Sequence, residues 1–318
     1  MADRPGSASV EGSVGRYRHE AFLYSGMAEF LAGTMSFIRR AISAGDPILV
    51  VVSEPKIDLL CQGLGAEARD VSFADMAEVG DNPACIIAAW RAFAQAHAGV
   101  RQLWGIGEPV YPGRSPTELA ECQLHEALLN VAFDDSAPFW LLCPYDLEAL
   151  TADVIDEAHR THPFVARGEC REASPSFRPV DLAAPFARPL PASPADAACV
   201  SFRSGGLRDV RRFVAEHASE AGLDQQSAAG LVMAVNEIAT NSVRHGGGQG
   251  ELRAWSDSHS VVCEVSDQGH ISSPLAGRLP PVLDSGTGGG LFLANQLCDL
   301  VQISSSADGT AVRVYRDI

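Results

Sequence analysis

The stretch NEIATNSVRH, at positions 236–245, decides how the C-terminal part of this sequence folds. It continues a helical pattern that starts near Asp224, so we predict a helix over residues 224–244. Glu237 and Asn241 are four positions apart, which places both side chains on one helix face about one turn apart. A carboxylate there can accept a proton from an attacking hydroxyl, and an amide oxygen can ligate Mg²⁺. Taken alone, the pair also fits an ordinary exposed helix face.

Two further segments carry related chemistry. DQG, residues 267–269, directly follows a predicted strand, and a carboxylate beside a glycine there can accept a hydrogen bond from an adenine amino group. GTGGGL, residues 286–291, leads into a predicted helix. Its glycines let backbone N–H groups approach phosphate oxygens, and a helix N-terminus favours negative charge. Alone, the first is a common turn and the second resembles a flexible linker.

The elements around these segments predict the architecture of the C-terminal part. Helices and strands come in separate runs, which is typical of an α+β sandwich with one layer of each. The predicted strands are 199–203, 251–256, 260–266, 301–305 and 311–315, and the predicted helices are 206–221, 224–244 and 291–297.

The order and spacing of the three segments resemble the GHKL ATPase superfamily, in which they look like the N, G1 and G2 boxes of the Bergerat fold. Within that superfamily, residues 237–246 and the tail 288–301 are similar to the anti-sigma factor serine kinases. The resemblance covers about 115 residues. It implies that ATP and Mg²⁺ bind here.

By position, the resemblance assigns roles to individual residues. Glu237 would be the general base, Asn241 would hold the metal, and Asp267 would hold the adenine beside Gly269. Residues 272–285 would form a lid over the nucleotide. In this family a second glycine usually follows the G1 box, where this sequence has His270 and Ile271. The remaining contacts to the nucleotide would come from Gly286, Gly288, Gly289, Gly290 and Leu291.

The chain divides at a segment with six prolines, residues 168–198, which predicts an extended connector. It separates an N-terminal domain, 17–167, from a C-terminal one, 199–318. In the N-terminal domain, predicted strands alternate with helices, which argues for an α/β fold with a mainly parallel sheet. The strands are 47–53, 102–106 and 139–143, and the helices are 27–42, 82–98 and 118–133.

Three stretches of this first domain, HEAFLY at 19–24, WGIGE at 104–108 and LLCPYD at 141–146, resemble the MEDS sensory domain. The resemblance implies a RecA-like sheet without a working phosphate loop, and small-molecule sensing. Polar residues at strand ends are where open α/β sheets bind ligands. The alternative is that they are core and capping residues of an inert scaffold. The candidate sensory residues are His19, Tyr24, Glu108, Tyr145 and Asp146.

Together, the resemblances imply an ATP-dependent protein-serine kinase and anti-sigma regulatory factor, gated by the sensory domain. Its partners would be an anti-anti-sigma factor, a sigma factor or both, and relatives of the C-terminal domain act as dimers. A sensor histidine kinase is an alternative, although His125, His159 and His162 lie outside any convincing two-helix hairpin. A third alternative is a non-catalytic module whose nucleotide only shapes a partner-binding surface.

The amino-acid composition limits the other functions and locations that this chain can have. Forty acidic residues against 24 basic ones give a net charge of −16, which disfavours direct binding to nucleic acid. No apolar run is long enough to cross a membrane, and the N-terminus lacks the pattern of a signal peptide, so we expect a cytoplasmic protein. The eight cysteines contain no C-x-x-C pair, so we expect thiols rather than disulfides or a zinc site.

Overall fold

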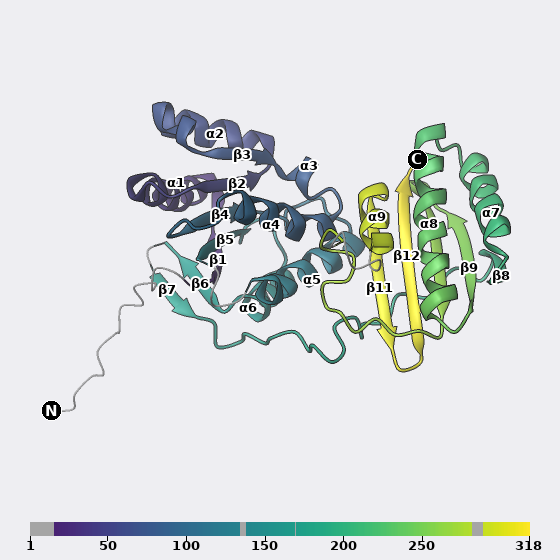
Figure 1. Ribbon diagram of the computed structural model, residues 1–318. Coiled ribbons are helices and arrows are strands. Elements are labelled where there is room, and N and C mark those ends of the chain that lie inside the picture. The colour runs from purple at the N-terminus through teal and green to yellow at the C-terminus, as the bar shows by residue number, and fades with distance from the viewer. Residues whose placement is uncertain (1–15, 134–137, 169, 282–288) are drawn as a thin grey trace. The chain divides into compact units, whose positions relative to one another are not determined.

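A computed structural model describes residues 16–133, 138–168, 170–281 and 289–318 (Figure 1). By its internal contacts the chain forms two compact units. Unit 1 comprises residues 1–78, 92–114 and 132–179. Unit 2 comprises residues 79–91, 115–131 and 180–318. The boundaries of 167/168 and 198/199 suggested by the sequence stay predictions.

Unit 1 is built on a seven-stranded sheet with the order β3-β2-β4-β5-β1-β6-β7. Neighbouring strands are parallel, except that β7 runs antiparallel to β6. The predicted α/β class with a mainly parallel sheet is therefore confirmed. The strands are β1 Arg18–Tyr24, β2 Ile48–Val52, β3 Ser72–Asp75, β4 Leu103–Gly107, β5 Phe139–Asp146, β6 Phe164–Arg167 and β7 Cys170–Ala173.

Strand β7 lies inside the segment that the sequence predicts as a connector. It is an edge strand, and it ends before the first proline of that segment, Pro175. A short strand without proline at a sheet edge is compatible with the proline-rich composition that follows it. The helices of the N-terminal half are α1 Gly26–Ala44, α2 Glu54–Leu64, η1 Gly65–Asp70, α3 Met76–Val79, η2 Pro83–Cys85, α4 Ile86–Ala96, α5 Pro116–Ala132 and α6 Ala152–Thr161.

Helices α1 and α2 pack on one face of this sheet and build an aromatic core. Phe37 of α1 is fully buried, and its ring meets Trp104 and Trp140 edge-on, with centroids 4.9 and 5.4 Å away. Edge-to-face aromatic pairs are favoured by the ring quadrupoles. Helix α1 ends at Gly45, whose φ of +69° suits glycine far better than other residues.

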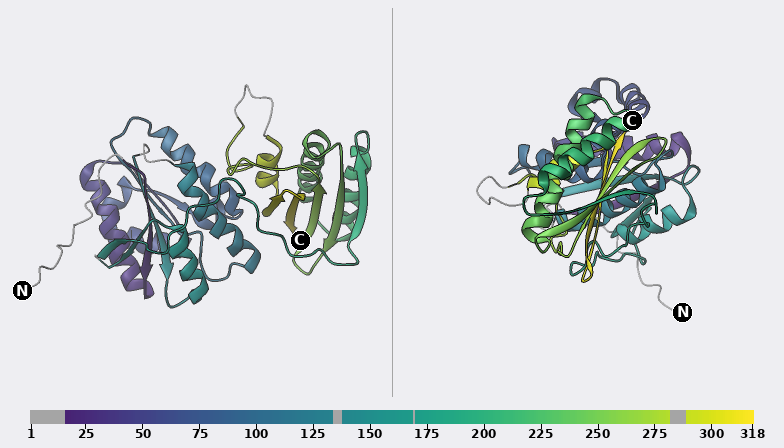
Figure 2. Two further views of the ribbon diagram at one scale, coloured as in Figure 1. Left: turned by 90° about the horizontal axis from the view of Figure 1, so that it is seen from below. Right: turned by 90° about the vertical axis from the view of Figure 1, so that its right-hand side faces the viewer.

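Unit 2 contains a five-stranded antiparallel sheet with the order β11-β12-β10-β9-β8. Helices α7, α8 and α9 cover one face of it, as Figures 1 and 2 show. The predicted two-layer α+β sandwich is therefore confirmed. The elements are β8 Ala198–Arg203, α7 Leu207–Glu220, α8 Gln225–His245, β9 Gln249–Ser256, β10 Ser260–Asp267, α9 Gly289–Leu297, β11 Leu300–Ser306 and β12 Gly309–Asp317.

The core of unit 2 lies between these two layers. Val214 of α7 and Ile238 of α8 are buried against Cys263 and Val314 of the sheet. Because strand side chains alternate, residues next to these core positions project from the opposite face of the sheet.

The connector pairs with the edge strand β11 and covers part of that opposite face. The Ser305 backbone N–H donates to the Phe186 carbonyl at 2.8 Å, and Arg313 Nη2 donates to the Pro191 carbonyl at 2.6 Å. Arg313 also pairs with the buried carboxylate of Glu264 through Nε at 2.9 Å. Phe186 is buried as well, at 2% exposure, so this stretch of the connector is part of unit 2.

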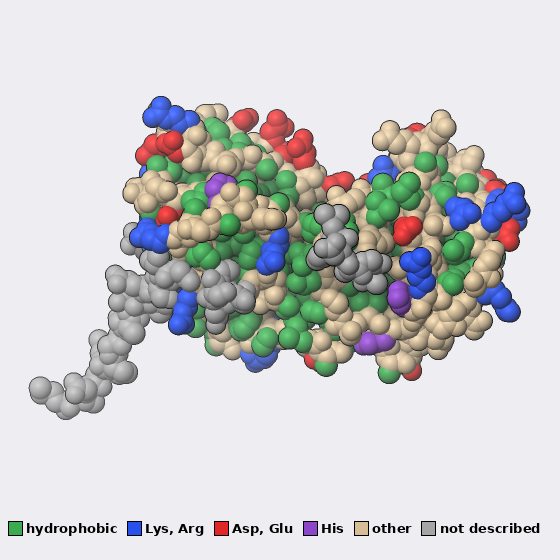
Figure 3. Space-filling view, in the orientation of Figure 1, with side chains coloured by type: hydrophobic (Ala, Val, Ile, Leu, Met, Phe, Trp, Pro, Cys, Tyr) green, Lys and Arg blue, Asp and Glu red, His purple; other side chains and the backbone are tan. Residues whose placement is uncertain are grey.

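Charged side chains of both signs are scattered over the face shown in Figure 3. In the part of the chain that the structure describes, no helix combines the length and apolar character needed to cross a membrane.

We expect the Phe37→Ala substitution to lower the free energy of unfolding of unit 1 by about 3–5 kcal/mol, because it leaves a cavity beside two stacked tryptophan rings. Urea unfolding followed by tryptophan fluorescence measures the loss. Met27→Ala is the control, since Met27 lies on the same helix and is 40% exposed. Equal effects of the two substitutions would contradict this description of the core.

Candidate functional site

Helix α8 positions the first pair of predicted site residues. It begins after Asp224, whose Oδ1 accepts hydrogen bonds from the Gln226 and Ser227 N–H groups at 2.7 and 3.1 Å. Such an N-cap satisfies backbone donors that the helix cannot satisfy itself. Glu237 and Asn241 follow in the second half of the helix, and both are half-buried. They therefore share one face, as predicted, within reach of solvent.

The start of helix α9 lies directly against this pair. A Cβ atom added at Gly290 would lie 3.2 Å from Asn241 Nδ2 and 3.3 Å from Glu237 Oε2. A side chain at this position would therefore crowd both groups. The first turn of a helix also presents unsatisfied backbone N–H groups, which favour anions. The carboxylate, the amide and this helix N-terminus thus lie at one place.

Asp267 lies at the C-terminal end of the same helix α8. A Cβ atom at Gly246, the residue that ends α8, would lie only 2.3 Å from Asp267 Cγ. Asp267 Oδ1 accepts a hydrogen bond from the Gly269 N–H at 2.7 Å. Two glycines thus allow the backbone to approach this carboxylate closely. Glu237, Asn241 and Asp267 follow one another along the second half of α8 and its end.

The segment after Asp267 is held by the β11–β12 hairpin. The Thr310 hydroxyl donates to the Gly269 carbonyl at 2.9 Å, and the Ser305 Oγ accepts from the Ile271 N–H at 2.8 Å. His270 Nδ1 lies 3.2 Å from the same Ser305 hydroxyl. Ile271 packs against the core of unit 2. The two residues that depart from the family pattern are thus anchored by hydrogen bonds and apolar packing.

An open pocket of about 770 Å³ borders Asp267. Its lining includes Arg203, Glu251 and Asp308 but neither Glu237 nor Asn241. We assign the candidate site to the region between α8 and the start of α9, because a carboxylate, an amide and a helix N-terminus converge there.

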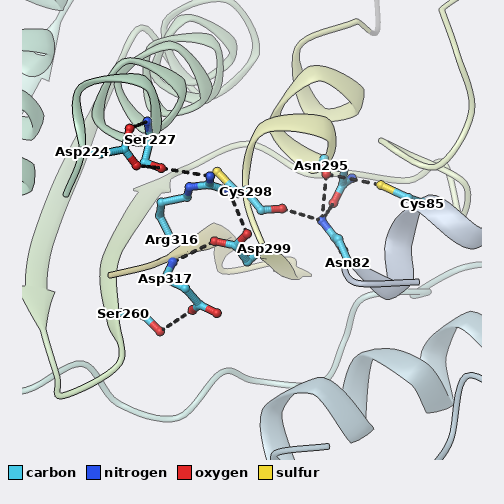
Figure 4. A network of polar contacts seen from close by, with 10 residues as sticks. All are labelled: Asn82, Cys85, Asp224, Ser227, Ser260, Asn295, Cys298, Asp299, Arg316 and Asp317. Carbon is cyan, nitrogen blue, oxygen red and sulfur yellow. Dashed lines mark hydrogen bonds and ion pairs between the residues drawn. The ribbon is translucent and has the colours of Figure 1, made fainter. Parts of the chain in front are cut away.

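A polar network ties the ends of the strands to α8 and α9 (Figure 4). The Arg316 guanidinium donates to Asp299 at 2.7 Å and to the Ser227 hydroxyl at 3.1 Å. Asp299 also accepts from the Asp317 N–H at 2.7 Å. This network fixes the N-terminal end of α8, far along the helix from Glu237.

Family models match both parts of the chain. Residues 18–163 match the MEDS domain, the methanogen/methylotroph DcmR sensory domain, and residues 200–316 match the histidine kinase-like ATPase domain. The chain carries a MEDS domain and a histidine kinase-like ATPase domain. The family resemblances stated from the sequence are confirmed at this level.

Two solved structures show a distant likeness. One is the RsbU and RsbW domains of Rv1364c from Mycobacterium tuberculosis, with 17% identity, a TM-score of 0.30 and coverage of 65% of this chain and 49% of that one. The other is the histidine kinase AdeS of Acinetobacter baumannii, with 12% identity, a TM-score of 0.23 and coverage of 38% and 67%. The chain spans about half the length of the first. No curated protein matches it.

The first part of the predicted lid of the ATPase domain, residues 272–281, is anchored to helix α9. The buried amide of Asn295 donates to the Gly277 carbonyl at 2.9 Å, and Asn82 in turn donates to the Asn295 carbonyl at 3.0 Å. Arg278 is 3% exposed and forms an ion pair with Glu121 of α5. All these residues belong to unit 2. The remaining lid residues, Gly286 and Gly288 lie outside the described residues.

Two of the candidate sensory residues of the MEDS domain meet on the α1 side of the sheet. The Tyr24 hydroxyl donates to Glu108 Oε1 at 2.9 Å. Lys56 Nζ donates to the Tyr24 hydroxyl at 2.8 Å and to both Glu108 oxygens at 2.6 and 2.7 Å. Burial raises the pKa of the Glu108 carboxyl, and the nearby Lys56 ammonium opposes that rise. Burial and the charge of Glu108 raise the pKa of the Tyr24 hydroxyl, which therefore stays protonated.

The other candidates divide between the two faces. Asp146 alternates with Tyr145 along β5, so it projects to the same face as Tyr24, whose pKa its charge also raises. His19 and Tyr145 project to the opposite face, where each packs against the ring of His162. The five residues thus form two separate groups, and their sensory role stays a prediction.

Sequence reasoning missed several residues of these sites. Lys56 follows β2 after the short stretch Ser53-Glu54-Pro55, and only its position beyond a strand end could have drawn attention to it. Ser305 and Thr310 act from a hairpin about 40 residues after Asp267, without a local pattern that marks them.

We expect the Lys56→Met substitution to destabilise the chain by about 3 kcal/mol at neutral pH, because it leaves the Glu108 carboxylate buried without a cation. The folded-state pKa of Glu108 would then lie well above its unfolded value. The folded state would bind more protons, so the deficit relative to the wild type shrinks as pH falls. Unfolding at about pH 7.5 and about pH 5.5 measures this difference.

The matched control is Arg39→Met, which removes an exposed ion pair with Glu67. Exposed pairs contribute about 0–1 kcal/mol, so little change is expected at either pH. A Lys56→Met deficit that is small, or that grows on acidification, would contradict the ion-pair description.

Proposed function

We propose that this chain is an ATP-dependent protein-serine kinase of the anti-sigma type, gated by its N-terminal sensory domain. The observation that carries the proposal is the approach of Gly290 to Glu237 and Asn241 at one end of the site, with Asp267 at the other. These groups follow one another along the second half of helix α8. Their order matches that of the parts of a nucleoside triphosphate, with the base at Asp267 and the phosphates and metal at Asn241 and Glu237.

The residues present fit ATP and Mg²⁺. Asp267 offers a carboxylate to the amino group of adenine, and Gly246 and Gly269 let the backbone pack directly against that carboxylate and hold it in place. Asn241 offers an amide oxygen, a ligand type that Mg²⁺ accepts alongside phosphate and water. The backbone N–H groups at the start of α9 favour phosphate oxygens. When bound, Mg²⁺ would neutralise charge that develops on the transferred phosphoryl group.

Glu237 would act as the general base. Its carboxylate would accept the proton of a serine hydroxyl on the protein substrate as that oxygen forms a bond to the γ-phosphorus. The bond from the γ-phosphorus to the bridging oxygen would break, and ADP would leave with the electron pair. Glu237 is half-buried, so a substrate side chain can reach it from solvent. Its position beside the start of α9 suits this role.

Gating is supported by contacts to the segment next to the glycine loop. The ion pair of Arg278 with Glu121 and the hydrogen bond of Asn82 to Asn295 join residues that the two family models match separately. Both lead to residues 272–281 or to helix α9. A ligand that shifts Glu121 or Asn82 would therefore change how this segment is held.

The partners follow from the similarity of residues 237–246 and 288–301 to anti-sigma factor kinases. We propose an anti-anti-sigma protein as the phosphate acceptor and a sigma factor as the second partner. The small-molecule ligand would bind the MEDS domain.

The central test compares Glu237→Gln with Asp267→Asn in the full chain. Glu237→Gln should lower phosphate transfer from ATP to an anti-anti-sigma protein of the same genome by about 10²–10⁴-fold and leave the Kd for Mg-ATP nearly unchanged. Asp267→Asn should raise that Kd by about 10–100-fold, because it removes a charge-assisted hydrogen bond. Calorimetry measures binding, and radiolabelled ATP measures transfer.

Glu216→Gln serves as the control, since Glu216 lies exposed on helix α7. If transfer is absent in the wild type while ATP binds, the chain is a non-catalytic nucleotide-dependent module. If the labelled product is lost in acid, the acceptor is histidine rather than serine. Either result overturns the serine kinase proposal.

A second test addresses gating. We expect Glu121→Gln to weaken Mg-ATP binding by about 10-fold, because Arg278 loses its ion-pair partner and residues 272–281 must be ordered at the cost of binding free energy. Glu67→Gln, which changes an exposed carboxylate, should leave the Kd unchanged. An unchanged Kd in Glu121→Gln would contradict the proposed route.

A further inference from the structure

Three buried side chains with nitrogen and sulfur donors meet on the second face of the sheet in unit 1. They are His19 of β1, Cys143 of β5 and His162, which follows helix α6, and each is at most 1% exposed. Cys143 Sγ lies 3.4 Å from His19 Nε2, and the two imidazole rings have centroids 4.0 Å apart. One donor atom of each side chain lies within 4.8 Å of the other two.

The topology brings these residues together. Strands β1 and β5 are parallel neighbours, with His19 opposite Leu141 and Ala21 opposite Cys143. Residues two apart in a strand point to the same face, so His19 and Cys143 share a face in adjacent rows. Helix α6 ends at Thr161, and the chain then enters β6 on the other side of β1. His162 stands at that turn.

The hydrogen bonds of His162 select one of its ring nitrogens as a donor to a ligand. Its Nδ1 lies 2.9 Å from the Ala158 carbonyl oxygen. The Thr161 hydroxyl also lies 3.0 Å from Nδ1, but a carbonyl can only accept, so the Ala158 contact favours the tautomer with the proton on Nδ1. In a neutral imidazole the lone pair is then on Nε2. Metal-binding histidines commonly donate their second N–H to a backbone carbonyl in this way, which fixes the tautomer and the orientation of the ring.

The distances suit a metal ion. Nitrogen and sulfur ligands of one tetrahedral zinc ion lie about 3.6 Å apart, given Zn–N bonds of about 2.0–2.1 Å and Zn–S bonds of about 2.3 Å. The observed separation between Cys143 Sγ and His19 Nε2 is 3.4 Å. Imidazole and thiolate together favour zinc and related transition metals over Mg²⁺ or Ca²⁺.

We propose that His19, Cys143 and His162 bind a divalent transition-metal ion of the zinc class. All three ligands belong to unit 1, and the fourth position of a tetrahedral ion would be left to a ligand from outside this group. The sequence offers no C-x-x-C signal for this site, because 124 positions separate His19 from Cys143. The site does not depend on the nucleotide proposal, since none of its ligands lies in the ATPase domain.

The test uses the full chain, stripped of metal with a chelator and titrated with Co²⁺. Exposed Cys170 and Cys199 are first replaced by serine so that they cannot contribute. We expect one equivalent of Co²⁺ to bind with a thiolate-to-cobalt absorption band, and Zn²⁺ to displace it. Cys143→Ser should abolish the band. Loss of a residue that only orients a metal ligand typically weakens binding by about 10–100-fold. His162→Gln should weaken Co²⁺ binding by more than that.

Cys61→Ser and His97→Gln are the matched controls, one thiol and one imidazole of unit 1 outside the group, and both should keep the band. Circular dichroism and thermal unfolding show whether each variant is folded. The number of Co²⁺ equivalents bound is measured on the parent chain, which keeps all proposed ligands. It therefore tests the proposal even if Cys143→Ser does not fold. Absence of Co²⁺ and Zn²⁺ binding at micromolar concentrations, or a band that survives in folded Cys143→Ser, would overturn the proposal.

Discussion

The close approach of Gly246 to Asp267 is the constraint on which the candidate nucleotide site depends. Any side chain at position 246 would overlap the Asp267 carboxyl group, so α8 must end on a glycine for β10 to bring its last residue against the helix. Once these two are in contact, Asn241 and Glu237 lie at successive turns farther back along α8. The register of β10 with β12 then sets Thr310 opposite Asp267. The contact between Gly246 and Asp267 thus determines how Glu237 and Asn241 of α8 lie relative to Asp267 of β10.

In unit 1 the alternation of strand side chains separates two kinds of chemistry. The face toward α1 holds Tyr24, Glu108 and Lys56, which form a hydrogen-bonded ion pair. The opposite face holds the imidazoles of His19 and His162 with the Cys143 thiol. A single strand thickness divides them, and neighbouring residues of β1 and β5 contribute to different faces. Substitutions at adjacent positions are therefore expected to report on different environments.

The sequence predicted the parts of the structure that local patterns encode. Helices such as α1 and α8 have apolar spacing and clear ends, and Glu237 and Asn241 lie in the helix that was predicted for them. Asp267 is the last residue of β10, one position beyond the predicted strand. Lys56, Ser305 and Thr310 were not singled out as site residues, because their partners come from strands or loops far away in the chain. Such contacts depend on strand order and register, which a single sequence specifies only indirectly.

The connector on the outer face of the second sheet limits how the C-terminal half can be reused. Arg313 and Ser305 take main-chain partners from residues 186–191, and Phe186 is buried there. A fragment cut at residue 200 would lose these partners and expose a charged sheet face that is now covered. For transplantation into a chimaeric receptor, a fragment that begins near residue 180 would therefore keep these partners, but it would still lack residues 79–91 and 115–131 of unit 2.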